Sequence, residues 1–359
     1  MDDILPFPLL ALVGQPELKT ALVLGLINPQ IGGVLLSGPY GVGKTTAVRG
    51  LLDILPMVEH EEVDQQGQVR RVWRPMRLIE LPLNARLEDV VGGIDERVAL
   101  EQQRVLLEPG VLTKAHRNVL YVDEINLLDP HIIDAILDAA AQGRTMVRRG
   151  PMVRITSAQF VLIGSMNPEE GVLRPQIQDR FGLRVWVSPL ADVGQRLLIY
   201  QRVQAFRQDA SVFRRAYAEA TTQLADEIAS AREILPHVVI PRDLEALALH
   251  IIQELRIPSH RAEIAMLEAA RARAAADFRG EVVIEDIQHI APLALRQRQS
   301  QAFEAYEARV QAENQLIATT LQRLTGASSP LGGALASTDE PAVEASTSQR
   351  MVHQLEDEP

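Results

Sequence analysis

The 359-residue sequence contains no cysteine, which excludes disulfides, thiolate zinc sites, iron–sulfur clusters and a cysteine nucleophile. Aromatic residues make up only 4% of the chain, so aliphatic residues carry most of its 47% hydrophobic content. Such a composition favours aliphatic helices and buried parallel strands over an aromatic-rich β-sandwich. Lysine is also scarce, and the only three are Lys19, Lys44 and Lys114.

Long apolar runs and excess positive charge are missing as well. The most apolar early stretch, residues 21–36, is interrupted by Asn-Pro-Gln at 28–30, which argues against a membrane span. Residues 1–3 are acidic, unlike the basic start of a signal peptide, so we expect a cytoplasmic protein. The 36 basic and 47 acidic residues give a net charge of −11, which disfavours nucleic acid as a partner.

Short apolar runs alternate with stretches of helical spacing over residues 1–190. This pattern predicts an α/β domain in which helices cover both faces of a parallel sheet. The polar composition of residues 57–76 predicts a loop or hairpin. The alternation of apolar and polar residues over 144–159 predicts an inserted β-hairpin. The expected strands lie at 32–37, 77–81, 119–122, 160–164 and 183–187.

The chain changes character after this domain. Residues 191–323 show periodic leucine, isoleucine and alanine and predict a helical lid domain. Residues 324–359 are small, polar and acidic and predict a disordered tail.

A glycine-rich motif between an expected strand and an expected helix (45–55) matches the Walker A pattern G-x-x-x-x-G-K-[ST]. Glycine permits the backbone angles that turn several N–H groups toward one polyphosphate. Lys44 then reaches the β- and γ-phosphates, and the Thr45 hydroxyl binds Mg²⁺. We therefore predict ATP and Mg²⁺ as ligands. The expected nucleotide-binding residues are Gly38, Pro39, Tyr40, Gly41, Val42, Gly43, Lys44, Thr45 and Thr46.

A second motif supports the first. The apolar run 119–122 is followed by Asp123 and Glu124, as in a Walker B strand. At the carboxyl end of a parallel strand, Asp123 can hold Mg²⁺ and Glu124 can polarise an attacking water. An aspartate after a strand can also be a helix N-cap, but two matching motifs favour catalysis.

Two further residues are candidates on weaker patterns. Asn167 follows the run 160–164, where it could orient the attacking water, although an asparagine before proline is also common in turns. Arg180 lies in Asp-Arg-Phe-Gly, where it could act as an arginine finger toward a neighbouring subunit. A solvated arginine at a helix end explains Arg180 equally well from the sequence alone.

With these elements in place, the chain resembles the ATPase (I) subunit of magnesium chelatase over about residues 6–300. The most specific runs are Glu108–Asp129, which contains the Walker B strand, and Gly164–Leu183, which contains Asn167 and Arg180. The resemblance implies an AAA+ module with an insertion within Leu87–Leu112 and the inserted hairpin at 144–159. It also assigns sensor 1 to Asn167, the arginine finger to Arg180 and sensor 2 to Arg261.

The resemblance further implies an ATP-driven ring, expected to be a hexamer, that powers Mg²⁺ insertion into protoporphyrin IX for chlorophyll or bacteriochlorophyll synthesis. The implied partners are the integrin-domain subunit and the porphyrin-binding subunit. Four alternatives remain open at this point. They are a chelatase-like paralogue for another metal, a MoxR-type chaperone that loads a cofactor into its partner, a nucleic-acid translocase and a catalytically inactive scaffold. Arg148, Arg149 and Arg154 on the expected hairpin favour the translocase slightly, and the acidic charge opposes it.

Overall fold

The computed structural model describes residues 5–63, 69–94, 107–149, 152–299 and 301–326. Contacts divide the chain into two compact units, Met1–Gln299 and Ser300–Pro359, and the described part of the second is helix α14 (Gln301–Gly326). No described helix is long and apolar enough to cross a membrane. The domain boundary at residue 190 stays a prediction, and from residue 327 on the predicted tail lies outside the described residues.

All five predicted strands form one parallel sheet in the order β11-β1-β10-β7-β4. β1 lies between β10 and β11, with Ser37 level with Met166 on one side and Trp186 on the other. The Walker A and Walker B motifs and Asn167 therefore follow strands that end at the same edge. The strands are β1 (Val34–Ser37), β4 (Leu78–Leu81), β7 (Val119–Val122), β10 (Val161–Met166) and β11 (Leu183–Trp186).

Both faces of the sheet are buried, as the unbroken apolar runs predict. Along β1, Val34 and Leu36 belong to one hydrophobic cluster and Leu35 to the other, because successive side chains point to opposite faces. The first cluster includes α1 (Pro16–Ile27) and α2 (Lys44–Arg49). The second includes α3 (Leu87–Val91), α5 (Val111–Lys114), α6 (Pro130–Gln142) and α7 (Pro175–Gln178).

The helix predicted over 45–55 is α2 followed by a 3₁₀ turn, η3 (Gly50–Asp53). A Cβ atom at Gly50 would lie 2.9 Å from the Phe7 carbonyl oxygen, so glycine lets the N-terminal segment pass against this turn. The other 3₁₀ turns are η1 (Leu9–Ala11), η2 (Pro29–Ile31), η4 (Ile125–Leu127), η5 (Pro168–Glu170) and η6 (Leu235–His237).

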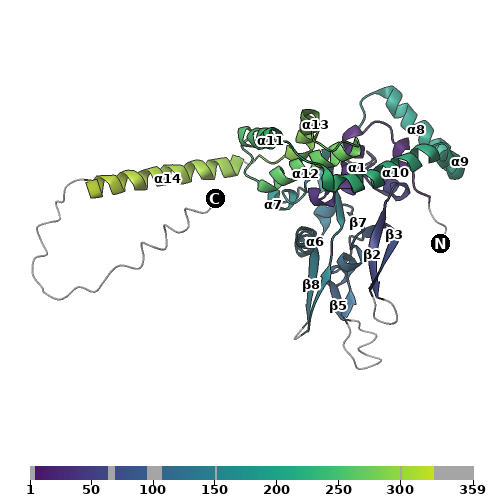
Figure 1. Cartoon of the computed structure of the whole chain (residues 1–359), viewed down its shortest axis with the longest axis horizontal. Helices are drawn as coiled ribbons and strands as arrows, with labels where there is room; N and C mark the ends of the chain where they lie inside the picture. Colours follow the sequence, from purple (N-terminus) through teal and green to yellow (C-terminus); the bar gives the residue numbers. More distant parts are fainter. Residues whose placement is uncertain (1–4, 64–68, 95–106, 150–151, 300, 327–359) are drawn as a thin grey trace, which may run out of the picture. The chain divides into compact units, whose positions relative to one another are not determined.

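Three antiparallel strand pairs form separate two-stranded sheets among the described residues. β2 (Met57–Val63) pairs with β3 (Val69–Pro75), and β8 (Arg144–Arg149) pairs with β9 (Met152–Ser157), which confirms both predicted hairpins. β5 (Gly92–Ile94) pairs with β6 (Leu107–Pro109) within the predicted insertion, whose residues 95–106 lie outside the described part. Figure 1 shows β2, β3, β5 and β8 extending away from helix α13 (Ile284–Leu295).

The lid helices surround one alanine-rich helix, α12 (His260–Ala276). It contacts α10, α11 and α13 and also packs on α1, which joins the lid to the sheet domain. Small side chains permit this close approach, and eight residues of α12, seven of them alanine, are buried. The remaining helices are α8 (Val193–Gln208), α9 (Ala210–Arg215), α10 (Ala218–Ile234), α11 (Arg242–Glu254) and α13 (Ile284–Leu295).

Candidate active site

The Walker A loop follows β1 and is shaped by its glycines. A Cβ atom at Gly38 would lie 2.2 Å from the Val187 carbonyl oxygen, so no other residue fits there. Gly41 and Gly43 have φ angles of 74° and 92°, in the left-handed region that favours glycine. Apart from its chain neighbours, no atom of the described residues lies within 4 Å of a Cβ built on Gly41, which leaves that side of the loop open. This arrangement fits a loop that wraps around a polyphosphate.

Lys44 is buried at the start of α2 and points into its own loop. Its Nζ donates to the carbonyl oxygens of Gly38 at 2.5 Å and Pro39 at 2.8 Å. Burial lowers the pKa of Lys44, while the nearby Asp123, Glu124 and Glu170 act in the opposite direction. A phosphate in the loop would offer this ammonium group a stronger, charged acceptor than the two carbonyls.

Thr45 and Asp123 come together as the sequence predicts. The Thr45 hydroxyl donates to Asp123 Oδ2 at 3.0 Å, joining the Walker A helix to the end of β7. The other carboxylate oxygen, Oδ1, accepts from the Tyr121 hydroxyl at 2.8 Å and from the Ser165 hydroxyl. A carboxylate and a hydroxyl are hard oxygen ligands, and Mg²⁺ in phosphate sites needs few protein ligands. These residues therefore fit a magnesium ion that also binds phosphate.

Glu124 follows Asp123 in a strained conformation. Its φ is 51°, in the left-handed region, and its N–H donates to the Ser165 hydroxyl at 3.1 Å. Non-glycine residues held in this region cost about 1 kcal/mol or more and are concentrated at functional sites. Partial burial raises the pKa of the Glu124 carboxyl, and Glu170 and Asp123 raise it further. A raised pKa makes this carboxylate a better proton acceptor.

Asn167 lies directly after β10 at the same edge of the sheet. Its Oδ1 accepts from the backbone N–H of Glu169 at 3.2 Å, which fixes the side-chain orientation. The amide Nδ2 is buried and has no hydrogen-bond partner among the described residues. Buried donors are nearly always paired, so this one is available to a ligand or a water in the site. Tyr40 in the loop and Thr46 on α2, also predicted here, are both exposed.

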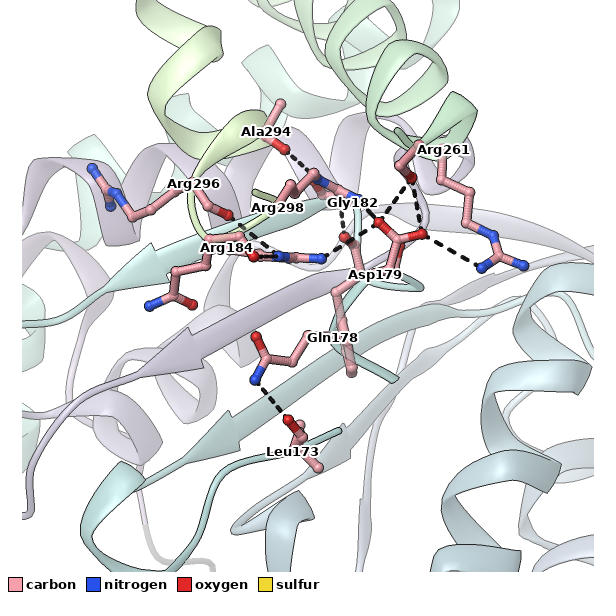
Figure 2. Close-up of polar contacts among 12 residues, drawn as sticks. Leu173, Gln178, Asp179, Gly182, Arg184, Arg261, Ala294, Arg296 and Arg298 are labelled. Carbon is pink, nitrogen blue, oxygen red and sulfur yellow. Dashed lines mark hydrogen bonds and ion pairs between the residues drawn. The ribbon is translucent and has the colours of Figure 1, made fainter. Parts of the chain in front are cut away.

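Arg180 and Arg261 do not join this cluster. Arg180 precedes β11, whereas the Walker loop follows β1, and the paired strands β1 and β11 separate the two by about 10 Å or more. Arg180 Nη1 lies 2.5 Å from Asp138 Oδ1 on α6. Arg261 Nη1 lies 3.7 Å from Asp179 Oδ2 (Figure 2). The structure thus brings both arginines to one region, away from the chain's own nucleotide loop.

Comparison with known proteins bears directly on this arrangement. The family model for magnesium chelatase subunit ChlI matches residues 9–180, and the AAA lid domain matches residues 239–317. A magnesium-chelatase subunit ChlI homolog from Methanocaldococcus jannaschii is 40% identical over 310 residues, covering 81% of this chain and 85% of the relative. The subunit ChlI of Mesostigma viride is 38% identical over 314 residues, covering 81% and 87%.

The chain belongs to the magnesium chelatase subunit ChlI family. This confirms the resemblance seen in the runs 108–129 and 164–183. Among solved structures, a complex between subunits BchI and BchD of magnesium chelatase contains a chain that is 34% identical, with a TM-score of 0.47 over 84% of this chain and 99% of that one. A crystal structure of a Cytophaga hutchinsonii protein assigned as an ATPase is 20% identical, with a TM-score of 0.57 over 88% and 91%; this likeness concerns the fold alone.

Two residues at the site of this ChlI-family chain, Tyr121 and Ser165, were not predicted from the sequence. Tyr121 lies in β7, two residues before Asp123, which directly follows that strand, so the alternation of an extended chain places both side chains on one face. That signal was available from the sequence. Ser165 reaches Asp123 from the neighbouring strand, and only the pairing of β10 with β7 shows this. Together these two hydroxyls fix the Asp123 carboxylate in position.

Proposed function

We propose that the chain binds ATP and Mg²⁺ and hydrolyses ATP as the motor subunit of a magnesium chelatase. The observation that carries the proposal is the Thr45–Asp123 contact, with Glu124 and the unpartnered Asn167 amide beside it at one edge of the sheet. Family membership supports the same activity.

Each residue has a role in this proposal. Lys44 leaves its two carbonyl partners to bind the β- and γ-phosphates, and the open side of the loop at Gly41 admits them. Thr45 and Asp123 hold Mg²⁺, which neutralises charge on the phosphates. Glu124 accepts a proton from the attacking water, and the Asn167 amide orients that water.

The site needs a cation from outside its own chain, since Arg180 and Arg261 both lie away from the nucleotide loop. We infer that the chain works in a ring, expected to be hexameric, in which both arginines approach the γ-phosphate held by the neighbouring subunit. Integrin-domain and porphyrin-binding chelatase subunits are the expected partners. In this proposal, the ring drives insertion of Mg²⁺ into protoporphyrin IX for chlorophyll or bacteriochlorophyll synthesis.

The first test is steady-state ATP hydrolysis by purified Glu124→Gln and Lys44→Ala variants. Glu124→Gln should keep nucleotide binding and lower turnover by about 100-fold, because an amide cannot accept the proton. Lys44→Ala should weaken nucleotide binding itself. Glu245→Gln on the exposed surface of α11 is the matched control and should behave as wild type. Equal turnover in Glu124→Gln and wild type would reject the site assignment.

The second test addresses the client. The wild-type chain, mixed with the integrin-domain and porphyrin-binding subunits, ATP and Mg²⁺, should convert protoporphyrin IX to its fluorescent magnesium form. Glu124→Gln is the negative control. ATP hydrolysis without this product would reject the chelatase role and leave the ATPase assignment in place.

A further inference from the structure

Arg298, which follows helix α13 of the lid, has a completely buried side chain. Its guanidinium donates to Asp179 Oδ1 at 2.6 Å and to the carbonyl oxygens of Phe181 at 2.7 Å, Gly182 at 3.0 Å and Asp179 at 3.2 Å (Figure 2). Its Nε donates to the Ala294 carbonyl oxygen at 2.6 Å. One lid side chain therefore holds the backbone on both sides of Arg180. We call residues 179–182 the Arg180 turn.

Asp179 extends this contact to a second lid helix. Its carboxylate accepts from the Ser259 hydroxyl at 2.8 and 2.9 Å, and Ser259 is the N-cap residue that directly precedes α12. Arg261, in the first turn of α12, lies 3.7 Å from the same carboxylate. Figure 2 shows Arg298, Arg261 and Arg184 converging on Asp179. Arg261 thus contacts the residue that directly precedes Arg180, which brings together the two arginines expected to act on a neighbouring subunit.

The remaining side of the turn is fixed by the sheet domain. A Cβ atom at Gly182 would lie 1.7 Å from the Ile31 carbonyl oxygen, and Phe181 is fully buried. The backbone after Arg180 is therefore pressed against η2. The Arg180 side chain, in contrast, is 28% exposed. A rigid backbone carrying a solvent-accessible side chain is the arrangement that presentation of a cation to another molecule requires.

Stability alone does not account for two buried arginines here. Arg184 is also buried and shares Asp179, lying 3.7 Å from it, so two buried guanidinium groups face one carboxylate in addition to the exposed Arg261. Taking charges out of water is costly, and replacing both partners of a buried ion pair by apolar residues is often neutral or stabilising. Unlike an apolar side chain, the Arg298 guanidinium orients the backbone around it, because its planar donors fix several acceptors at once.

We propose that Arg298 is a positioning residue that holds Arg180 and Arg261 as one unit and couples the placement of this unit to the lid. The proposal rests on the trans role of these arginines in the proposed function. A substitution of Arg298 should therefore lower ATP hydrolysis in the neighbouring subunit, which receives Arg180 and Arg261 from this chain. It should not affect hydrolysis of the nucleotide that this chain binds itself.

Rings that mix two variants can separate an effect on the neighbouring subunit's site from an effect on the chain's own site. A chain with Lys44→Ala can only donate the arginines, and a chain with Arg180→Ala can only offer the nucleotide site. Their mixture should recover ATP hydrolysis at the interfaces that combine both intact halves. Arg298→Met is then added to the donating chain in one mixture and to the accepting chain in the other. Methionine keeps much of the volume of the side chain and removes its donors.

When Arg298→Met is on the donating chain, we expect the ATP turnover of the mixture to fall by about tenfold or more, because small misplacements of a reacting group have effects of this size. On the accepting chain the change should stay within about twofold. Equal losses in both mixtures, or no loss on the donating chain, would overturn the proposal. If the parent mixture of Lys44→Ala and Arg180→Ala shows no recovery, the trans role itself fails, which is a separate outcome.

Two further variants guard against a simple folding defect. Arg296→Met removes a nearby arginine whose side chain binds Glu17 on α1 instead of the Arg180 turn, and it should leave the donating mixture unchanged. Arg298→Lys keeps a positive charge beside Asp179, whereas Arg298→Met removes one partner of that carboxylate and leaves the other in place. Arg298→Lys should therefore retain the thermal unfolding temperature better than Arg298→Met. With Arg298→Lys on the donating chain, the ATP turnover of the mixture should still be several-fold lower than with Arg298 in place. Full turnover with this variant would contradict a requirement for the planar guanidinium.

Discussion

Arg180 Nη1 lies 2.5 Å from Asp138 Oδ1, and this ion pair joins the Arg180 turn to helix α6 of the same chain. The side chains are 28% and 55% exposed, so the pair contributes about 1 kcal/mol or less to stability. If Arg180 acts on a neighbouring subunit, it has to exchange Asp138 for phosphate. Asp138 therefore competes with the nucleotide of the neighbour for the same cation.

Asp138→Asn should ease this exchange. We expect the protein concentration that gives half-maximal specific ATPase activity to fall by about two- to fivefold, the range that up to 1 kcal/mol allows. The measurement is specific activity over a dilution series. Asp134→Asn, one turn earlier on the exposed side of α6, is the matched control and should leave the curve in place. A curve for Asp138→Asn that moves to higher concentration would show that Asp138 orients Arg180 productively.

The environment of Glu124 predicts a pH dependence. Its pKa is raised by burial, then by Glu170 and Asp123, so protonation begins at a higher pH than for an ordinary glutamate. Because the base must be ionised to accept a proton, kcat/KM should fall with decreasing pH through this raised pKa. Glu170→Gln removes one source of the shift and should move the acid limb of the profile to lower pH. Glu245→Gln should not move it.

Tyr121 supplies a test of how Asp123 is held. Tyr121→Phe removes the 2.8 Å hydrogen bond to Asp123 Oδ1 and keeps the ring that packs beneath the site. Partners of metal ligands typically contribute tenfold or more to metal affinity. We expect the Mg²⁺ concentration for half-maximal ATPase activity to rise by about that factor, measured by titrating Mg²⁺ at constant ATP. The exposed Tyr200→Phe on α8 is the control, and equal Mg²⁺ requirements in both variants would reject the role.

Much of the fold and of the nucleotide site could be predicted because the signals are local. Each strand is a short apolar run between turns, and the Walker A residues depend on spacing within eight positions. The position of Asp123 and Asn167 at one edge of the sheet could be predicted because the carboxyl ends of parallel strands share that edge.

The contacts around Arg180 could not be predicted in this way. Asp138 and Arg180 are 42 positions apart, and Asp179 and Arg298 are 119 positions apart. Both contacts depend on how α6 and the lid pack against the sheet domain, which no spacing within the sequence encodes. An arginine that follows an apolar helix would be expected to lie in solvent at the helix end, yet the Arg298 side chain is wholly buried. Its role follows only from the four acceptor atoms on the Arg180 turn.

The last prediction concerns Gly182 in the Arg180 turn. A Cβ atom there would lie 1.7 Å from the Ile31 carbonyl oxygen and 2.9 Å from the Ile31 side chain, so the backbone has to move. Gly182→Ala should therefore lower the free energy of unfolding by about 3 kcal/mol or more, at or above the upper end of overpacking effects. Gly280→Ala is the matched control, because a Cβ built there meets no atom within 4 Å. Its unfolding should stay within about 0.5 kcal/mol of wild type, as for ordinary surface substitutions. Denaturant unfolding of both variants measures the difference. Equal stabilities would contradict the close approach of Gly182 to η2, on which the rigidity of the Arg180 turn depends.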